Sequence, residues 1–450
     1  MSGLRRTLGV IEAFSLSLSI IGPTMAISFV TALMGQVAGR AIPLAFLIGA
    51  VTVALVGLSF VAFGRRVAHA GSVYAYITDV FGPRWGFVAG WLLLLSYVVF
   101  TAGATALVGS FAAAGLAHAG IETPDLWVPM SAAGALMASW LVWTDTRIAM
   151  RLMLALEGVS VTAILLLALV ILTHVPPSLL PLVPDSEHGW SGVGFGTAFA
   201  ITALAGFEGA ATLGEEALDP KRAIPIAVLG TVIVVGLFYV VVSYAEVMGY
   251  GINQVQAIAR AETPLDELST RFISGRFAVL IDLAAAASGF ACVIGSLSAG
   301  ARLLYALGRA GLSSALGRVH PRHGTPTQAV LLVAGINLVS LLLLGRQSGV
   351  GPYVGALATI ATLALILVYM GVTAAEAVFA FHQKRAGRCI IGSLGTLLLL
   401  WPLWNSLYPL PDWPGILWPY LIVAWLIIGV VLVRVRPSVT DIDLQTEATG

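Results

Sequence analysis

Long apolar runs separated by short polar segments form the main pattern of this chain. A run of about 20 apolar residues is long enough to cross a bilayer as a helix. The pattern predicts twelve such helices, approximately at 9–37, 41–64, 84–114, 126–145, 149–174, 191–216, 223–249, 276–307, 326–345, 352–381, 389–408 and 413–434. We therefore expect an all-α integral membrane protein with twelve transmembrane helices.

The composition supports this class and narrows the partners. Of 450 residues, 58% are hydrophobic and 10% are charged, whereas about a quarter of a soluble domain is charged. The net charge of +1 argues against a nucleic-acid partner. We expect a single transmembrane domain over residues 1–436 in the cell membrane, and a short cytoplasmic tail at 437–450. The lipid bilayer is the expected surrounding, and no obligatory protein partner is evident.

Basic residues indicate the orientation of the helices. With a cytoplasmic N-terminus, the loops outside the cell receive only a few of the 23 Lys and Arg, namely Arg40, Arg260, Arg271, Arg276 and Arg346. Because basic residues favour cytoplasmic loops, both termini are expected in the cytoplasm. The longest outside loop, 250–275, predicts short amphipathic helices across the outer mouth, with an ordinary solvated loop as the alternative.

Two expected spans are interrupted near their middle. Span 1 contains Gly22-Pro23-Thr24, and span 6 contains Ala205-Gly206-Phe207 followed by Glu208. Proline and glycine loosen a helix, and a break inside a bilayer is tolerated where it lines a cavity. Two opposed breaks offer N–H groups to a carboxylate and C=O groups to an ammonium. A simple proline kink is the alternative for span 1.

A short internal repeat relates the two halves of the chain. RAIPLA (40–45) begins span 2, and RAIPIA (222–227) begins span 7. In the expected orientation these copies lie on opposite faces, which is the pattern of an inverted repeat. The pattern predicts two inverted five-helix repeats, spans 1–5 (about 9–174) and 6–10 (about 191–381), followed by two extra helices (389–434). Coincidence in an alanine-rich chain is the alternative.

Three segments carry a family resemblance. GFEGAATLGEEALDPKRAIP (206–225), AGSVYAYITDVFGPRWGFVAGW (70–91) and ARLLYALGRAGLSSALGRVHPRHGTP (301–326) resemble the amino acid–polyamine–organocation transporter family. The resemblance implies the twelve-helix fold with inverted repeats and broken helices 1 and 6, working by alternating access. It also implies transport of amino acids or related amines, often coupled to protons or by exchange.

The resemblance implies a substrate site at the two breaks. Here Gly22-Pro23-Thr24 replaces the family's Gly-Ser/Thr-Gly, and Tyr97 matches a tyrosine that faces the substrate from span 3. The family's aromatic residue before the acid is missing, and Phe207 is a possible substitute. The expected substrate-binding residues are Ile20, Gly22, Pro23, Thr24, Tyr97, Ala203, Leu204, Gly206 and Phe207.

Carboxylates within the spans are the candidates for coupling transport to protons. A charge at bilayer depth usually marks a functional site. Glu208 is expected to carry a proton or bind a substrate amine, with a structural helix cap as the alternative. Glu157 aligns with a coupling lysine of proton-coupled members, with Ser160 as the competing alignment and an interfacial acid as the alternative reading. Asp282, early in span 8, is interpreted as an interfacial acid.

A charge cluster follows span 6. Glu215 and Glu216 lie close to basic residues that include Arg65, and we interpret them as an inner gate. A solvated charge cluster is the alternative.

The remaining features bear on coupling and on rival functions. No cofactor is expected: a proton gradient would drive transport, and sodium is not excluded because span 8 offers Ser296 and Ser298, although such serines often bond their own helix. The chain contains no HExxH, phosphate loop or nucleophile elbow, so we do not expect an enzyme. We expect a secondary active transporter for a small neutral or weakly polar amino acid, with a polyamine or amine antiporter as the alternative.

Overall fold

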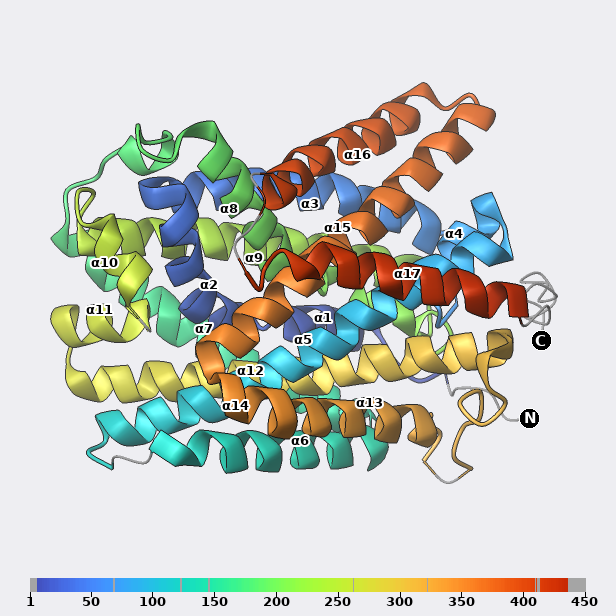
Figure 1. Ribbon diagram of the computed structural model, residues 1–450, viewed down its shortest axis with the longest axis horizontal. Helices are drawn as coiled ribbons and strands as arrows, with labels where there is room; N and C mark the ends of the chain where they lie inside the picture. The colour runs from blue at the N-terminus through green and yellow to red at the C-terminus, as the bar shows by residue number, and fades with distance from the viewer. Residues whose placement is uncertain are drawn as a thin grey trace.

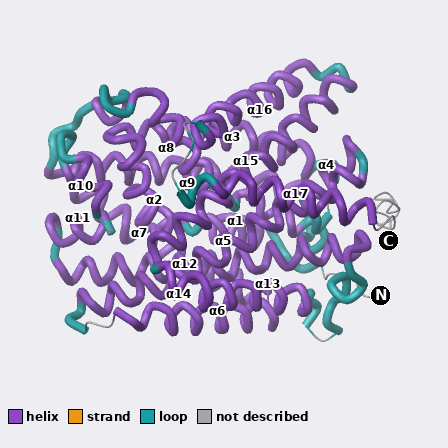
Figure 2. Tube along the Cα trace, viewed as in Figure 1, coloured by secondary structure: helices purple, strands orange, loops and turns teal. Residues whose placement is uncertain are grey.

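The chain is helical throughout the part that is described. The computed structural model describes residues 6–67, 69–121, 124–144, 146–261, 263–321, 323–408, 410 and 413–435. These residues form no strand, and their only strand-like pairing is one isolated bridge between Leu8 and Ala217 (Figure 2). The expected tail at 437–450 lies outside the described residues.

The long helices correspond to the expected spans. They are α1 (Val10–Ile21), α2 (Pro23–Ala38), α3 (Ile42–Gly64), α5 (Pro83–His118), α6 (Trp127–Thr144), α7 (Thr146–His174), α8 (Gly189–Ala203), α9 (Pro220–Tyr250), α12 (Gly275–Leu307), α13 (Thr327–Ser340), α15 (Val350–His382), α16 (Ala386–Leu407) and α17 (Leu417–Val435). Among the described residues, 10 helical stretches are long and apolar enough to cross a membrane. One of them, Val10–Gly64, contains the first two expected spans. The prediction of an all-α, multi-pass membrane protein is confirmed.

Most long helices run along the longest axis of the molecule (Figure 1). α5 packs along α12, and α3 packs along α9. The short helices α10 (Val255–Arg260) and α11 (Pro264–Phe272) lie at the left of Figure 1, whereas α17 ends at the right. The expected short helices in the 250–275 loop are thus present, at one end of the bundle. The remaining short helices are α4 (Val73–Phe81) and α14 (Arg346–Ser348).

The first break separates α1 from α2 at Gly22. This residue has φ +56°, a left-handed conformation that glycine adopts at little cost. Pro23 then starts α2, where a missing N–H is harmless. A side chain at position 22 would also meet Cys292, whose Cβ lies 3.0 Å from the place of an added Cβ. Local strain and packing therefore both favour glycine here.

The second break follows α8. Gly206 has φ +114° and precedes a tight 3₁₀ turn, η4 (Phe207–Leu213). A Cβ on Gly206 would lie 2.5 Å from Ile20 Cγ2 and 2.8 Å from the Ile21 nitrogen. The end of α1 thus packs directly against the second break, and the predicted breaks in helices 1 and 6 are confirmed.

Candidate functional site

Glu208 lies at the second break, with every carboxylate oxygen hydrogen-bonded. Its side chain is buried. Tyr369 Oη donates to Oε2 at 2.8 Å, and Tyr97 Oη donates to Oε1 at 3.3 Å. The backbone N–H of Gly206 donates to Oε2 at 3.0 Å. The carboxylate therefore joins α5 and α15 to an amide that the broken helix leaves free.

Free backbone groups at the two breaks are held by side chains from other helices. Cys292 Sγ donates to the carbonyl of Ile20 at 3.0 Å, and Tyr239 Oη donates to the carbonyl of Ala203 at 2.8 Å. Ser17 Oγ donates to the Phe207 carbonyl at 2.7 Å. These bonds satisfy groups that would otherwise be costly to bury.

Glu157 reaches the first break through a serine. Ser288 Oγ donates to both carboxylate oxygens of Glu157, at 2.9 Å and 3.0 Å. The same hydroxyl oxygen accepts from the backbone N–H of Met25, in the first turn of α2, at 3.2 Å. Glu157 is fully buried, so the alternative of a solvated interfacial acid does not describe it. The competing Ser160 donates to the carbonyls of Leu156 and Ala284.

An apolar cavity of about 60 Å³ adjoins both breaks. It is lined by residues on either side of the first break, by the last turn of α8, and by α5 and α15. The lining residues are Ile21, Met25, Ala26, Phe29, Val30, Val99, Phe100, Gly103, Ala104, Leu107, Thr202, Ala203, Val354, Leu357, Ala358 and Ala361. Thr202 is the one polar side chain among them, and its hydroxyl lies 2.5 Å from that of Thr362. The cavity therefore suits an aliphatic group beside the two breaks.

The expected substrate residues take different positions around this cavity. Ala203 lines it, whereas Tyr97 contacts Glu208 instead. The Phe207 ring packs against Tyr369, with ring centroids 5.3 Å apart, and does not line the cavity. Ile20, Pro23, Thr24 and Leu204 are all buried at the breaks. The buried Thr24 hydroxyl has no hydrogen-bond partner among the described residues.

The two serines considered as sodium ligands take part in hydrogen bonds within their own helix, α12. Ser296 Oγ donates to the Cys292 carbonyl at 2.6 Å and accepts from Thr101 Oγ1 at 3.0 Å. Ser298 is buried, and its carbonyl accepts from Arg302 Nη1 at 3.1 Å. Ser296 thus matches the alternative, in which such serines hydrogen-bond to the backbone of their own helix.

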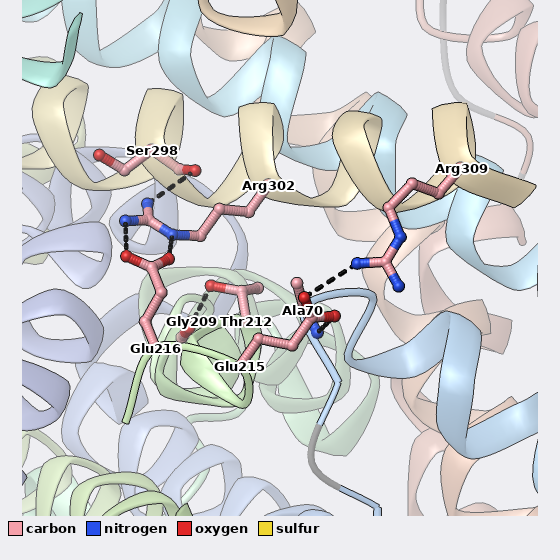
Figure 3. Close-up of polar contacts among 8 residues, drawn as sticks. All are labelled: Ala70, Gly209, Thr212, Glu215, Glu216, Ser298, Arg302 and Arg309. Atoms are coloured by element: carbon pink, nitrogen blue, oxygen red, sulfur yellow. Dashed lines mark hydrogen bonds and ion pairs between the residues drawn. The ribbon is translucent and has the colours of Figure 1, made fainter. Parts of the chain in front are cut away.

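Two ion pairs join the turn after η4 to α12 and to the short π-helix η5 (Gly308–Leu312) that follows it (Figure 3). Arg302 Nε and Nη2 donate to the two oxygens of Glu216, at 2.5 Å and 3.2 Å, and both side chains are buried. Arg309 Nη1 donates to Glu215 Oε2 at 2.9 Å, while the Ala70 N–H donates to Glu215 Oε1 at 3.1 Å. The Glu216–Arg302 pair is therefore buried, not a solvated cluster.

Arg65, the expected partner of these glutamates, does not pair with them. Arg65 is exposed, and among the described residues no ion pair joins it to Glu215 or Glu216. Arg302 and Arg309 were missed because they lie more than eighty residues further along the chain. Tyr369, Cys292 and Ser288 were missed for the same reason, although a thiol or hydroxyl within an apolar span was a usable signal.

Comparisons with known proteins agree with this arrangement. The profile of the family described as amino acid permease matches residues 8–445. The chain is 26% identical to the branched-chain amino acid permease BcaP of Lactococcus lactis, over 68% of each chain. It is 26% identical to BcaP of Bacillus subtilis, over 72% of this chain and 71% of the relative. It is 24% identical to the low-affinity putrescine importer PlaP of Escherichia coli, over 75% of each.

The family match extends over nearly the whole chain and includes both breaks. It confirms the prediction of a membrane transporter that is not an enzyme. The chain belongs to the amino acid permease family, within the amino acid–polyamine–organocation superfamily.

Proposed function

We propose that this permease carries a neutral aliphatic amino acid across the cell membrane by alternating access, coupled to protons. The observation that carries the proposal is the apolar cavity next to two broken helices. Apolar walls with a few polar groups at one side are typical of a site that recognises a small apolar ligand. Two relatives named as branched-chain amino acid permeases support the same substrate class.

The backbone at the breaks supplies the groups that would bind the substrate's charged end. The carboxylate would rest on the N–H and the hydroxyl of Thr24, because Pro23 has no N–H and the Gly22 N–H donates to the Leu18 carbonyl. The Thr24 hydroxyl is unpartnered among the described residues. The ammonium would rest on carbonyls near Ile20 and Leu204. The Ile20 carbonyl already accepts from Cys292, but a carbonyl oxygen has a second lone pair for another donor. The aliphatic side chain would then enter the cavity.

Glu208 and Glu157 are the proposed proton carriers. Both are buried, and neither has an arginine or lysine partner among the described residues. Glu208 accepts from two tyrosine hydroxyls and one backbone amide, and Glu157 accepts from the Ser288 hydroxyl. Glu216, by contrast, is fixed by Arg302. A carboxylate held only by hydroxyls and amides can exchange a proton without leaving a buried cation unpaired. Sodium coupling is the less favoured alternative, because the Ser296 hydroxyl already donates to its own helix.

The moving parts of the proposed cycle are the two repeats. The two copies of the RAIP repeat lie at the starts of α3 and α9, and these helices pack against one another. This symmetry supports inverted repeats over about 9–174 and 191–381. The ion pairs Glu216–Arg302 and Glu215–Arg309 would close the inner side, and the distribution of basic residues supports cytoplasmic termini.

A polyamine or amine carrier is the second candidate. The putrescine importer PlaP is a relative, and Glu208 offers a carboxylate that could bind an amine. The cavity argues against this candidate because no acidic side chain lines it. A diamine would leave its second ammonium against apolar walls, which is costly.

Uptake by purified protein in liposomes tests the proposal. We expect labelled leucine to enter against its gradient when a proton gradient is imposed, and putrescine and arginine to compete weakly. Glu208→Gln should abolish the response to the proton gradient, whereas Glu376→Gln, which changes a buried glutamate that pairs with Arg388, should retain it. Uptake of putrescine but not leucine would favour the amine carrier. Uptake driven by sodium alone would contradict proton coupling.

A further inference from the structure

Three potential metal ligands meet at the end of the bundle where α10 and α11 lie. They are His118, the last residue of α5, Asp266 of α11 and Asp282 of α12. One ligand atom from each lies within 4.8 Å of the other two. Gly115, one turn before His118, allows this approach: a Cβ there would lie 3.3 Å from the Asp282 Cβ. None of these residues belongs to the site at the helix breaks.

The two carboxylates are buried with oxygens left over. Asp282 is 0% exposed and Asp266 is 3% exposed. His118 Nδ1 lies 2.7 Å from Asp282 Oδ2, but Asp282 Oδ1 and Asp266 Oδ2 have no hydrogen-bond partner among the described residues. Buried carboxylate oxygens without a donor or cation are unfavourable.

The charges in this cluster do not balance. Two carboxylates face a single imidazole, which supplies at most one positive charge. The cluster therefore lacks positive charge, which one divalent cation or one shared proton would provide.

We propose that His118, Asp266 and Asp282 bind a divalent transition-metal cation of the Zn²⁺ class. One imidazole nitrogen and two carboxylate oxygens form a donor set that suits zinc, whereas calcium and magnesium prefer oxygen ligands alone. Three protein ligands leave a fourth position for water. The ion can enter from solvent because the His118 side chain is 37% exposed.

The site would tie a connecting segment to two long helices. α11 packs against α12 and also against α2, α7 and α9. A bound ion would join α11 to the ends of α5 and α12, so it would stabilise this end of the bundle as it is seen here. Because α2 follows the first break, the ion would also restrain a helix that adjoins the cavity.

Metal binding by the purified full-length protein tests this proposal without any transport assay. After treatment with a chelator and removal of any affinity tag, Zn²⁺ and Mg²⁺ are titrated separately by calorimetry, and thermal unfolding is followed in parallel. We expect one Zn²⁺ per chain and a higher Tm with Zn²⁺ but not with Mg²⁺. His118→Ala should weaken Zn²⁺ binding by at least about tenfold.

Further variants control for Zn²⁺ binding at another histidine and for loss of stability. His174→Ala removes another exposed histidine near α11, whose ring centroid lies 6.1 Å from that of Phe272, and it should bind Zn²⁺ as the unchanged protein does. His118→Ala also removes the partner of Asp282 Oδ2, so its metal-free Tm is measured beside its Zn²⁺ binding. Asp282→Asn, which removes a ligand without leaving that buried charge unpaired, is the second ligand variant.

Three results would overturn the site. They are the absence of a Zn²⁺-dependent Tm change in the unchanged protein, equal Zn²⁺ binding after His118→Ala, and loss of binding with His174→Ala alone. If Tm changes with pH but not with Zn²⁺, the cluster holds a proton shared by the two carboxyl groups, and the metal site is wrong.

Discussion

Tyr369 donates a hydrogen bond to Glu208 across the second helix break, with 2.8 Å between Oη and Oε2. The same oxygen accepts from the Gly206 N–H at 3.0 Å. A side chain of α15 thus fixes the carboxylate that fills the gap after α8. Any movement of α15 relative to the break must lengthen or replace this bond, which would link the proposed proton exchange at Glu208 to helix movement.

Replacing Tyr369 should therefore affect transport more than replacing Tyr97. Tyr369→Phe removes the shorter bond, and a hydrogen bond to a charged group contributes about 1.5–3 kcal/mol. We expect about tenfold slower proton-driven leucine uptake and a displaced pH profile. Tyr97→Phe removes the 3.3 Å bond and should have a smaller effect. Liposome uptake measured over a range of pH compares the two, and a larger effect of Tyr97→Phe would contradict this ranking.

The second break should not tolerate a side chain at Gly206. Gly206→Ala would strain the backbone by about 1–3 kcal/mol and press against Ile20 and the Ile21 nitrogen. We expect a clearly lower Tm and little transport. Gly158→Ala is the matched control, because a Cβ there meets nothing within 4 Å and alanine is the better helix former. Thermal unfolding in detergent checks both, and equal Tm values would contradict the close packing of the break.

The buried pair Glu216–Arg302 should behave as a unit. Arg302→Met alone leaves a buried carboxylate unpaired, which typically costs about 3–5 kcal/mol. Adding Glu216→Leu removes that charge and should restore most of the Tm. Arg65→Ala, at an exposed position, should change stability by less than about 0.5 kcal/mol.

Transport distinguishes a gate from a purely structural pair. If the pair closes the inner side, the double variant should regain its Tm while its leucine uptake stays impaired. Recovery of both stability and uptake would mean that the pair only supports the fold.

The cavity wall should set the size of the substrate. Phe100 lines the cavity, so Phe100→Ala would enlarge it and admit an aromatic side chain. We expect phenylalanine to compete with leucine about tenfold better. One methylene group more or less in an apolar pocket already changes the binding free energy by about 1–3 kcal/mol. Phe195→Ala, which removes a ring that stacks on Phe199 away from the cavity, is the control. Unchanged competition in both variants would place the substrate elsewhere.

The sequence predicted the breaks but not the groups that hold them. Gly22-Pro23 and Gly206 signal interruptions because glycine and proline act on the local backbone. The family resemblance predicted Tyr97 as a residue that faces the substrate, whereas the structure brings its hydroxyl to Glu208. Cys292 and Tyr239 could not be assigned, since their partners are carbonyls on other helices and any helical residue offers a carbonyl.

The partners of Glu215 and Glu216 could likewise not be assigned from the sequence. Glu215 and Glu216 stand out in the sequence, but Arg65 was chosen as their partner by its place at a nearby span end. Their actual partners, Arg302 and Arg309, lie one after the other along α12 and its following turn. Which of several arginines reaches a glutamate depends on helix packing, which the order of the spans alone does not define.

The most direct measurement of the central claim is a structure of the permease with leucine bound in a lipid nanodisc. The account predicts leucine between the two breaks, with its carboxylate on the Thr24 N–H and hydroxyl and its side chain in the cavity beside Phe100. Leucine bound away from both breaks, or spans 1 and 6 continuing as unbroken helices around it, would contradict the account.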